Sequence, residues 1–529
     1  MTTVEDSTRP DGERATRIDP VVFFVALAVS VAFVLWGVLS TESLASVAGA
    51  ALEWVIATFG WAFVVSTASF LTLATVLAFS RFGRIPLGKD EDRPEFRTAS
   101  WIAMMFSAGM GIGLMFFAVA EPISHLAAPP AGTARPLSEA AAQQAMAISY
   151  FHWALHPWAI YAIVGLALAF FTFRKGMPNL ISTAFHPLIG DRVNGPIGKS
   201  IDILAIFATL FGSATSLGLG ALQINGGLDF LWGIEPANGV AVAIIAVLTA
   251  CFVLSAVSGV SRGIQWLSNA NMVLALALVL FLLIVGPTVF QLETLVESVG
   301  GYIALLIPAS FRTGAFGDEE WLSSWTIFYW AWWISWAPFV GTFIARISKG
   351  RTIRQFVVGV LLIPSGVSFV WFAVFGGAAI NLQLTGAADL AGIVDQPEVA
   401  LFTMLEAFPL SGVTSFVVIV LVALFFISGA DAASVVMGML SSRGSLTPAR
   451  PVVVIWGVLT GAAAAILLLA GGLQALQQAA IIAAAPFTLV MIGLCVGLFK
   501  GLGQEAAPRL HRDRERAAAE AGPGRSASG

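Results

Sequence analysis

The sequence predicts an all-α polytopic membrane protein, and three observations support this prediction. Of the 529 residues, 58% are hydrophobic and only 11% are charged, with a mean hydropathy of +0.87. Soluble domains are about 25% charged. Apolar runs of about 20 residues, long enough to cross a bilayer, recur along the chain. Lysine and arginine gather in alternate connections between these runs, as expected for a chain that crosses a membrane repeatedly.

Twelve apolar runs predict twelve transmembrane helices. They lie near residues 21–40, 55–79, 99–120, 145–173, 201–227, 236–257, 267–287, 321–345, 354–381, 410–440, 451–472 and 479–500. The stretch after residue 287, QLETLVESVGGYIALLIPASFR, is amphipathic and too polar to span. It predicts a helix that lies along the outer membrane surface.

The basic residues predict the orientation of the chain. If both termini are cytoplasmic, 25 of the 27 lysines and arginines lie in cytoplasmic loops, tails or helix ends, and only Arg135 and Arg312 lie outside. Cytoplasmic loops are enriched in these residues. We therefore expect a multi-pass protein of the cell (inner or plasma) membrane, surrounded by lipid. The net charge of −4 gives no sign of a nucleic-acid partner.

Two interrupted segments predict an internal repeat. Gly109, Gly111 and Gly113 stand inside the third segment, where each interior glycine costs ~1 kcal/mol of helix stability relative to alanine. Pro338 and Gly341 interrupt the eighth. Close helix packing is the alternative explanation for the glycines. Interrupted segments at matching places in two halves, however, are typical of a transporter binding site.

The two halves are segments three to seven and eight to twelve. Five is an odd number, so the second set enters the membrane from the opposite side. We predict a five-plus-five inverted repeat preceded by two helices. The expected parts are a cytoplasmic tail (1–20), two accessory helices (21–98), the first repeat (99–287), the amphipathic outer surface helix (288–320), the second repeat (321–500) and a second cytoplasmic tail (501–529).

Tryptophan gathers at membrane depth in the eighth segment. Four indoles lie ~14–22 Å into it, near the bilayer centre: Trp330, Trp332, Trp333 and Trp336. An interfacial belt explains Trp321 and Trp325 at the end of the segment, but not these four.

The fourth segment carries a second aromatic cluster, FHWALHPWAIYA. On an ideal helix three of its rings fall within an arc of ~140°: Trp153, Trp158 and Tyr161. Pro157 removes a backbone donor and can bend the helix there. His152 and His156 flank the cluster, but a metal site would need further ligands, and we predict packing or hydrogen-bonding roles for both.

These features predict the class of ligand. Histidines and carboxylates are scarce at membrane depth, which disfavours metal or proton chemistry. A quaternary ammonium suits a group of indoles, because its diffuse charge lies over ring faces and donates no hydrogen bonds. An anionic group on the same molecule would find free N–H groups at the helix break within Gly109–Gly113. The sequence therefore predicts a small zwitterion with a permanently methylated nitrogen.

The motifs GMGIGLMFF, FHWALHPWAIYA, FGSATSLGLGALQI and FYWAWWISWAPFVGTFIARISKGRTIR resemble the betaine/choline/carnitine transporter family. The resemblance runs from about Val21 to Lys500. It implies twelve helices, ten of them in the inverted-repeat fold of sodium-coupled amino-acid transporters. It also implies a homotrimer and secondary uptake of trimethylammonium solutes such as glycine betaine.

The resemblance also implies roles for individual residues. The aromatic box would be Trp153, Trp158, Tyr161 and Trp333, with Trp332 and Trp336 lining the inner part of the pathway. Choline-type members tend to carry aspartate at the last glycine of GMGIG, whereas this chain has Gly113. A substrate with its own carboxylate, glycine betaine, is therefore expected over choline.

By the same resemblance sodium is the expected coupling ion, held by hydroxyl and carbonyl oxygens. One site would use Thr209 and Ser213, which share a helix face at a spacing of four, beside Phe339. Hydroxyls at this spacing also bond to the backbone one turn back, which is the alternative. The second site would use Ser107, Met110, Phe425 and Ser428. Where the family commonly reads TSADS, this chain reads SGADA, so Gly429 has lost a hydroxyl ligand.

Other functions remain as alternatives. Within the family, the chain could be a proton-coupled choline or carnitine carrier or an exchanger. A channel would need a continuous polar pore, often with rings of one charge. A membrane enzyme would need a nucleophile, a metal cluster or paired carboxylates in a site, and no such set stands out in the sequence.

Overall fold

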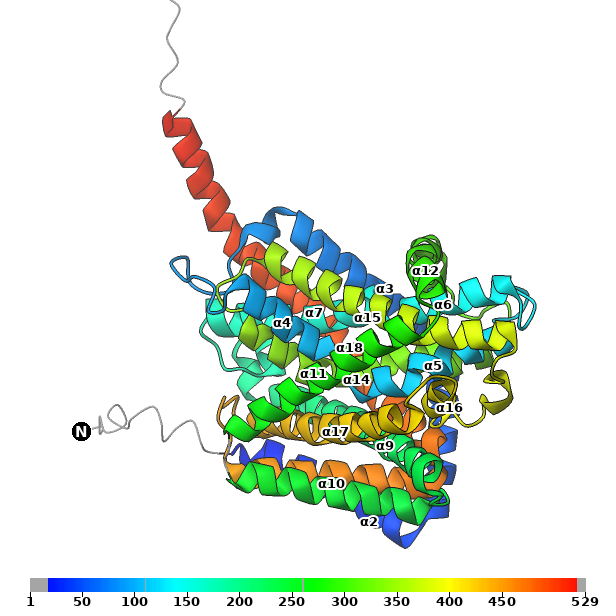
Figure 1. Ribbon diagram of the computed structural model, residues 1–529. Helices are drawn as coiled ribbons and strands as arrows, with labels where there is room; N and C mark the ends of the chain where they lie inside the picture. The colour runs from blue at the N-terminus through cyan, green and yellow to red at the C-terminus, as the bar shows by residue number, and fades with distance from the viewer. Residues whose placement is uncertain (1–17, 110, 259–260, 521–529) are drawn as a thin grey trace, which may run out of the picture.

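The computed structural model describes residues 18–109, 111–258 and 261–520, with side chains over 18–105, 111–256 and 269–506. These residues form a bundle of long helices (Figure 1). The described part contains no β-strand apart from an isolated antiparallel bridge between Pro86 and Thr352. The prediction of an all-α protein is confirmed.

Two helices precede the region that forms the site: α2 (Pro20–Leu39) and α3 (Thr41–Phe79). Asp19 caps α2, because its carboxylate accepts from the N–H groups of Val21 and Val22 at 3.0 and 3.2 Å. Lys199 donates to the same carboxylate at 3.0 Å and ties the start of α2 to a later helix.

The third and fourth segments are each divided into two helices. The third consists of α4 (Thr98–Gly109) and α5 (Ile112–Ala127), with Gly111 extended at φ −171° and ψ −178°. The fourth consists of α6 (Glu139–Trp153) and α7 (Leu155–Ala169), which meet at Ala154 with φ −105° and ψ −115°. The predicted break at the glycines is present, whereas the fourth segment breaks three residues before Pro157.

The rest of the first half is formed by α9 (Pro196–Trp232), α10 (Asn238–Ser258) and α11 (Ser261–Val285). Next comes α12 (Thr288–Ser310), in the stretch predicted to be amphipathic. Figure 1 shows α12 end-on, whereas α10, α11 and α17 run across the view, so α12 lies crosswise to them.

In the second half, a short α13 (Glu319–Leu322) and a π-turn, η5 (Ser323–Ile327), lead into α14 (Phe328–Ile347). The expected interruption at Pro338 and Gly341 was wrong, because α14 continues through both residues. A Cβ at Gly341 would come within 2.7 Å of Val164 on α7. This glycine allows two helices to pack closely. The irregular stretch of the second half is the π-helical turn η5, through which the chain stays helical.

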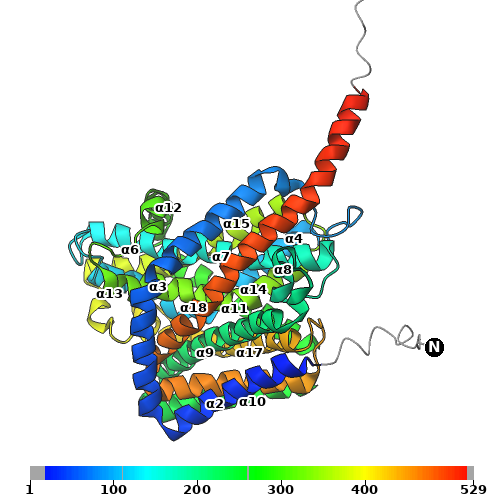
Figure 2. The ribbon, with the colours of Figure 1, turned by 180° about the vertical axis from the view of Figure 1, so that it is seen from behind.

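The chain continues through α15 (Ile353–Thr385), α16 (Ala400–Glu406), α17 (Ser411–Ser441) and α18 (Arg450–Glu520). The last of these covers the two final predicted segments. They are separated at Gly471 and Gly472, which have non-helical angles inside α18. Figure 2 shows the C-terminal part of α18 extending beyond the bundle.

Within the described residues, nine helices are long and apolar enough to cross a membrane. They include α12, and two shorter apolar helices cover Ile112–Ala127 and Asn269–Val285. The chain is thus a multi-pass membrane protein. Twelve spans and an inverted repeat remain predictions.

The basic connections lie together at one end of the bundle. Arg174 donates to Asp90 at 2.8 Å and to Glu505 at 2.7 Å, which joins the end of the fourth segment to the second loop and to α18. Arg346 donates to Glu95 at 2.8 Å, and this contact holds the pKa of the Glu95 carboxyl below its usual value. The loops predicted to be cytoplasmic therefore share one face of the molecule.

Helix α14 lies at the centre of the bundle and packs against α7, α9 and α18. Its tryptophans consequently lie among helices and away from lipid: Trp330 and Trp332 are each 1% exposed. The candidate site forms where α14 meets the breaks in the third and fourth segments.

Candidate functional site

An aromatic cavity lies where α5, α6, α7 and α14 meet. The predicted cage and pathway residues all line it: Trp153, Trp158, Tyr161, Trp332, Trp333 and Trp336, together with Gly111 and Gly113. Residues from three separate segments are thus brought to one place, as the sequence predicted. Gly109 ends α4, and its surroundings are not described.

The rings of this aromatic cavity form walls that meet at steep angles. Trp332 and Trp333 stack with centroids 4.6 Å apart and planes 16° from parallel. Trp153 stands edge-on to Trp333, at 4.9 Å and 71°. Tyr161 lies edge-on to Trp158, at 5.3 Å and 79°. Ring faces turned in different directions are the arrangement that surrounds a methylated ammonium group.

The indole N–H groups of four tryptophans are bonded to the protein itself. Trp153 donates to Glu121 at 2.6 Å and Trp333 to the His152 carbonyl at 3.0 Å. The other two acceptors lie on α9. Trp336 donates to the Gly212 carbonyl at 2.9 Å, and Trp332 donates to the Ser216 hydroxyl at 3.3 Å. These bonds set the ring orientations. What these four rings offer a ligand is therefore their faces and not their N–H groups.

The break in the fourth segment serves the same cavity. The carbonyl of His152 lies at the end of α6, and the discontinuity at Ala154 leaves it available to the indole of Trp333. A helix that continued straight through Ala154 would use this carbonyl for its own N–H···O ladder.

The N-terminus of α5 supplies N–H donors to the cavity. Helix α5 begins at Ile112, directly after the extended Gly111, and its first N–H groups have no partner within the helix. Such an end attracts anions. A Cβ at Gly113 would lie 2.7 Å from Trp332 and 2.9 Å from Trp153, whereas a Cβ at Gly111 would meet nothing within 4 Å. Gly113 thus allows the two rings to approach the helix end.

A second cavity adjoins the first and shares Gly111, Trp336 and Val340 with it. Four residues predicted to bind sodium line it: Ser213, Phe339, Phe425 and Ser428. Met110 lies outside the described residues, and only the backbone of Ser107, within α4, is described. Residues of the two predicted ion sites therefore line one cavity next to the aromatic cavity.

The hydroxyls around this second cavity differ in their bonding. Thr209 donates to the Ala205 carbonyl, one turn back on the same helix, at 2.8 Å and does not line the cavity. This is the alternative to sodium binding that the sequence left open for Thr209. Ser428 donates to the Leu424 carbonyl at 2.9 Å. Gly429 faces open space, since a Cβ there would meet nothing within 4 Å. The position that lost its hydroxyl has room for one.

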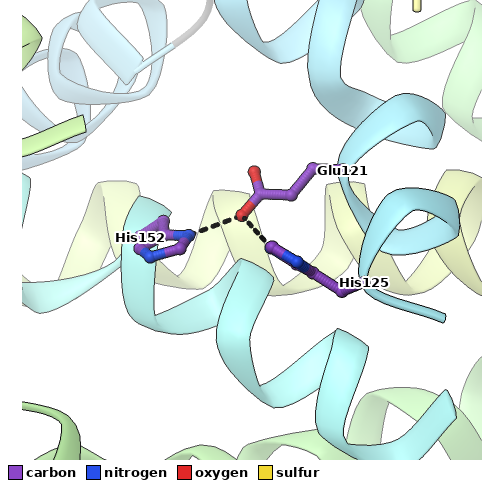
Figure 3. Close-up of side chains that lie close together, drawn as sticks. All are labelled: Glu121, His125 and His152. Carbon is purple, nitrogen blue, oxygen red and sulfur yellow. Dashed lines mark hydrogen bonds and ion pairs between the residues drawn. The ribbon is translucent and has the colours of Figure 1, made fainter. Parts of the chain in front are cut away.

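A buried acidic cluster lies behind Trp153, and sequence reasoning missed it. Glu121 on α5 is fully buried beside His125 and His152 (Figure 3). One carboxylate oxygen, Oε1, lies 2.6 Å from His152 Nδ1 and 3.3 Å from His125 Nε2. The expectation that carboxylates and histidines are scarce at this depth was wrong here. A signal was available, because Glu121 and His125 are spaced by four residues in an apolar segment.

The three side chains of this cluster offer ligand atoms within 4.8 Å of one another, as a metal site would. Two ligands at about 2.0–2.1 Å from a tetrahedral zinc ion would stand roughly 3.3 Å apart. Glu121 Oε1 and His152 Nδ1 are closer, at 2.6 Å, which is a hydrogen-bond distance. The arrangement fits a shared hydrogen bond better than a metal ion.

Trp321 and Trp325, predicted to belong to an interfacial belt, pack over this cluster. The ring centroids lie 5.3 and 4.5 Å from that of His125. Both tryptophans therefore cover the buried histidine at the outer end of the aromatic region.

Comparison with known proteins gives a consistent result. The betaine/carnitine/choline family transporter model matches residues 21–507. The glycine betaine transporter OpuD of Bacillus subtilis is 50% identical over 92% of this chain and 94% of its own length. A probable glycine betaine transporter of Desulfitobacterium hafniense is 45% identical over 91% and 97%. The betaine/ectoine transporter LcoP of Corynebacterium glutamicum is 43% identical over 93% and 79%.

Proposed function

The chain belongs to the betaine/carnitine/choline transporter family, and from this we propose that it imports glycine betaine or a related trimethylammonium solute by secondary active transport. It is a transporter and not an enzyme. The observation that carries the proposal is the aromatic cavity, whose ring faces suit a methylated ammonium while the N-terminus of α5 suits a carboxylate.

Glycine betaine is favoured over choline by the residues around Gly113. Its carboxylate would take the N–H groups at the start of α5, since the indole N–H groups of Trp153, Trp332, Trp333 and Trp336 are already bonded. Choline brings no anion for this end of the cavity. Competition of unlabelled choline against labelled betaine tests the preference, and stronger inhibition by choline would contradict it.

Sodium coupling is the second part of the proposal. Its support is the polar group of Ser213 and Ser428 in the second cavity, beside the start of α5. Hard oxygen ligands of this kind suit sodium. The alternative, a proton-coupled choline or carnitine carrier or an exchanger, draws support from Gly429, where a hydroxyl is missing.

We expect labelled glycine betaine to accumulate in vesicles reconstituted with the full chain when an inward sodium gradient is imposed. The gradient supplies the free energy for uphill transport, so uptake should fall to the equilibrium level when sodium is equal on both sides. Equal accumulation with lithium or potassium in place of sodium would refute sodium coupling, while leaving betaine transport in place. Saturation with substrate separates a carrier from a channel.

Gly429→Ser should strengthen sodium dependence. The added side chain has free space beside Ser428, and its hydroxyl restores an oxygen ligand to the second cavity. We expect the sodium concentration for half-maximal uptake to fall by about 3- to 10-fold, the effect of one hydrogen-bond-sized contribution of about 1 kcal/mol. The measurement is the sodium dependence of initial uptake rates at fixed betaine.

Gly412→Ser is the matched control for this variant. Gly412 also lies on α17 with nothing within 4 Å of an added Cβ, but it does not line the second cavity. Replacing a glycine of α17 away from the second cavity should leave the sodium dependence unchanged. An equal shift in both variants would show that helix propensity and not a new ligand is responsible.

The architecture belongs to the same proposal. Alternating access would be carried by the inverted repeat, with the break at Gly111 near the start of the first half and the π-helical turn η5 near the start of the second. Both termini would be cytoplasmic, on the face that gathers the basic loops. The homotrimer implied by the family resemblance is part of the proposal, and cross-linking in native membranes tests it.

A further inference from the structure

The buried carboxylate of Glu121 contacts the cage through one of its oxygens. Oε2 accepts from the indole of Trp153 and from the hydroxyl of Tyr329, each at 2.6 Å. Tyr329 in turn stacks on Trp333, with centroids 5.7 Å apart and planes 18° from parallel. Glu121 does not itself line the aromatic cavity. The indole of Trp153 separates Glu121 from the cavity.

The other oxygen faces two histidines that can both be neutral. His152 can donate a hydrogen bond from Nδ1–H to Oε1. Its Nε2 lies 3.0 Å from the Thr326 hydroxyl, which can donate to it. His125 gives Nε2–H, and its buried Nδ1 has no partner in the described structure. A doubly protonated His125 would bury an unpaired N–H donor, which is costly. The unpartnered Nδ1 decides this assignment for His125, and for His152 we take the Thr326 hydroxyl as the donor. With both histidines neutral, the carboxylate keeps its charge.

In the part of the chain that the structure describes, no permanent cation neutralises this carboxylate. Among the described residues, the charged or chargeable groups acting on it are His125 on its own helix and His152 on α6, and α14 contributes the Tyr329 hydroxyl. No lysine or arginine contacts it in the described part of the chain. Buried charges normally have an opposite charge as partner. With both histidines neutral, the described cluster has one negative charge and no positive partner for it.

We propose that the quaternary ammonium of the substrate is that missing partner, and that Glu121 is a positioning residue that attracts it through the Trp153 ring. This inference rests on the proposed function. The indole of Trp153 receives the cation on its ring face, while its N–H donates to the Glu121 carboxylate. Because this carboxylate is negatively charged, it also increases the electron density of the ring. Glu121 thereby supplies the cationic end of the site with a fixed countercharge without touching the substrate.

The expected contribution is large enough to measure. A cation held within about 6 Å of the ring centroid lies within about 10 Å of Oε2. At an effective dielectric constant of about 20, the attraction at that distance corresponds to roughly a 10-fold gain in affinity. The effect depends on the charge of the ligand and not on its shape.

A ligand pair separates charge from shape. Glycine betaine and 3,3-dimethylbutanoate have the same carboxylate and nearly the same form, but the second has a neutral tert-butyl group in place of the trimethylammonium. We expect Glu121→Gln in the full chain to weaken betaine about 10-fold. The neutral analogue, measured by inhibition of labelled betaine uptake, should change less than 3-fold, because the glutamine amide can still accept from Trp153.

Two further variants complete the experiment. His125→Lys places a fixed positive charge against Oε1 and should reduce the preference for betaine in the same direction, which tests the charge even if Glu121→Gln does not fold. Trp371→Phe is the uncharged control. Its indole donates to the Leu114 carbonyl at 3.0 Å and supports α5 from another side, so both ligands should change equally.

Equal weakening of both ligands in Glu121→Gln would overturn the inference, because it would show that the carboxylate only holds the fold. An unchanged betaine affinity in Glu121→Gln would overturn it as well. Failure of the proposed function gives a different result: the wild-type chain would neither transport nor bind betaine.

Discussion

Replacing Trp333 with leucine should lower the affinity for glycine betaine by about 100-fold and abolish measurable uptake at micromolar substrate. The variant removes one ring face, and a desolvated cation–π contact is worth about 2 kcal/mol, or about 30-fold. It also removes the stacking partner of Trp332 at 4.6 Å and the edge-on partner of Trp153 at 4.9 Å. The remaining loss comes from these rings, which no longer hold their positions. Equilibrium binding to the purified protein measures the effect.

Trp330→Leu is the matched control for this prediction. Trp330 lies three residues earlier on α14 and is 1% exposed, but it stacks on His156 at 5.0 Å and does not line the aromatic cavity. Both variants leave a similar void in a buried region, which costs about 3 kcal/mol or more of stability. Thermal unfolding should therefore be affected alike, whereas betaine affinity should fall only in Trp333→Leu. If both lost affinity equally, general loss of packing would explain the result.

The members of the aromatic cavity could be predicted because indoles at membrane depth need an unusual explanation. Trp153 and Trp333 lie far apart in the chain, yet each stands well inside its segment, and segments that cross the same bilayer place such residues at similar depth. The ring angles could not be predicted. They depend on acceptors such as the carbonyls of Gly212 and His152, whose availability follows from packing.

Glu121 lies outside the glycine pattern that marks the third segment, because it follows Gly113 by eight residues. Its partners His152 and Tyr329 lie on two other segments, so the cluster exists only after folding. An ionisable residue inside an apolar run is nevertheless a functional candidate by itself.

The positions of the helix breaks also needed the structure. Proline is tolerated inside membrane helices, where neighbouring groups can satisfy the freed carbonyl, and α14 continues through Pro338. The fourth segment breaks at Ala154, although alanine has the highest helix propensity. Tertiary contacts outweigh propensity here, because the His152 carbonyl bonds to the indole of Trp333.

Gly113 is the residue of the glycine stretch where an added methyl group should matter most. In Gly113→Ala the new Cβ would stand 2.7 Å from Trp332 and 2.9 Å from Trp153, closer than non-bonded carbon atoms approach. Neither ring can move freely, because Trp153 is bonded to Glu121 at 2.6 Å and Trp332 stacks on Trp333. Forced overpacking of this kind costs about 1–3 kcal/mol. We expect the KM for betaine to rise about 10- to 100-fold.

Gly111→Ala distinguishes ring contact from backbone freedom. Gly111 lines the same cavity, but its Cβ would meet nothing within 4 Å, and its extended angles of −171° and −178° are open to any residue. Its KM should therefore stay within about 3-fold of wild type. Equal losses in the two variants would mean that the glycines act through flexibility of the break. If the KM rises only in Gly113→Ala, any side chain at position 113, including the aspartate of choline-type members, requires Trp153 and Trp332 to move. Position 113 alone would then not set the choice of substrate.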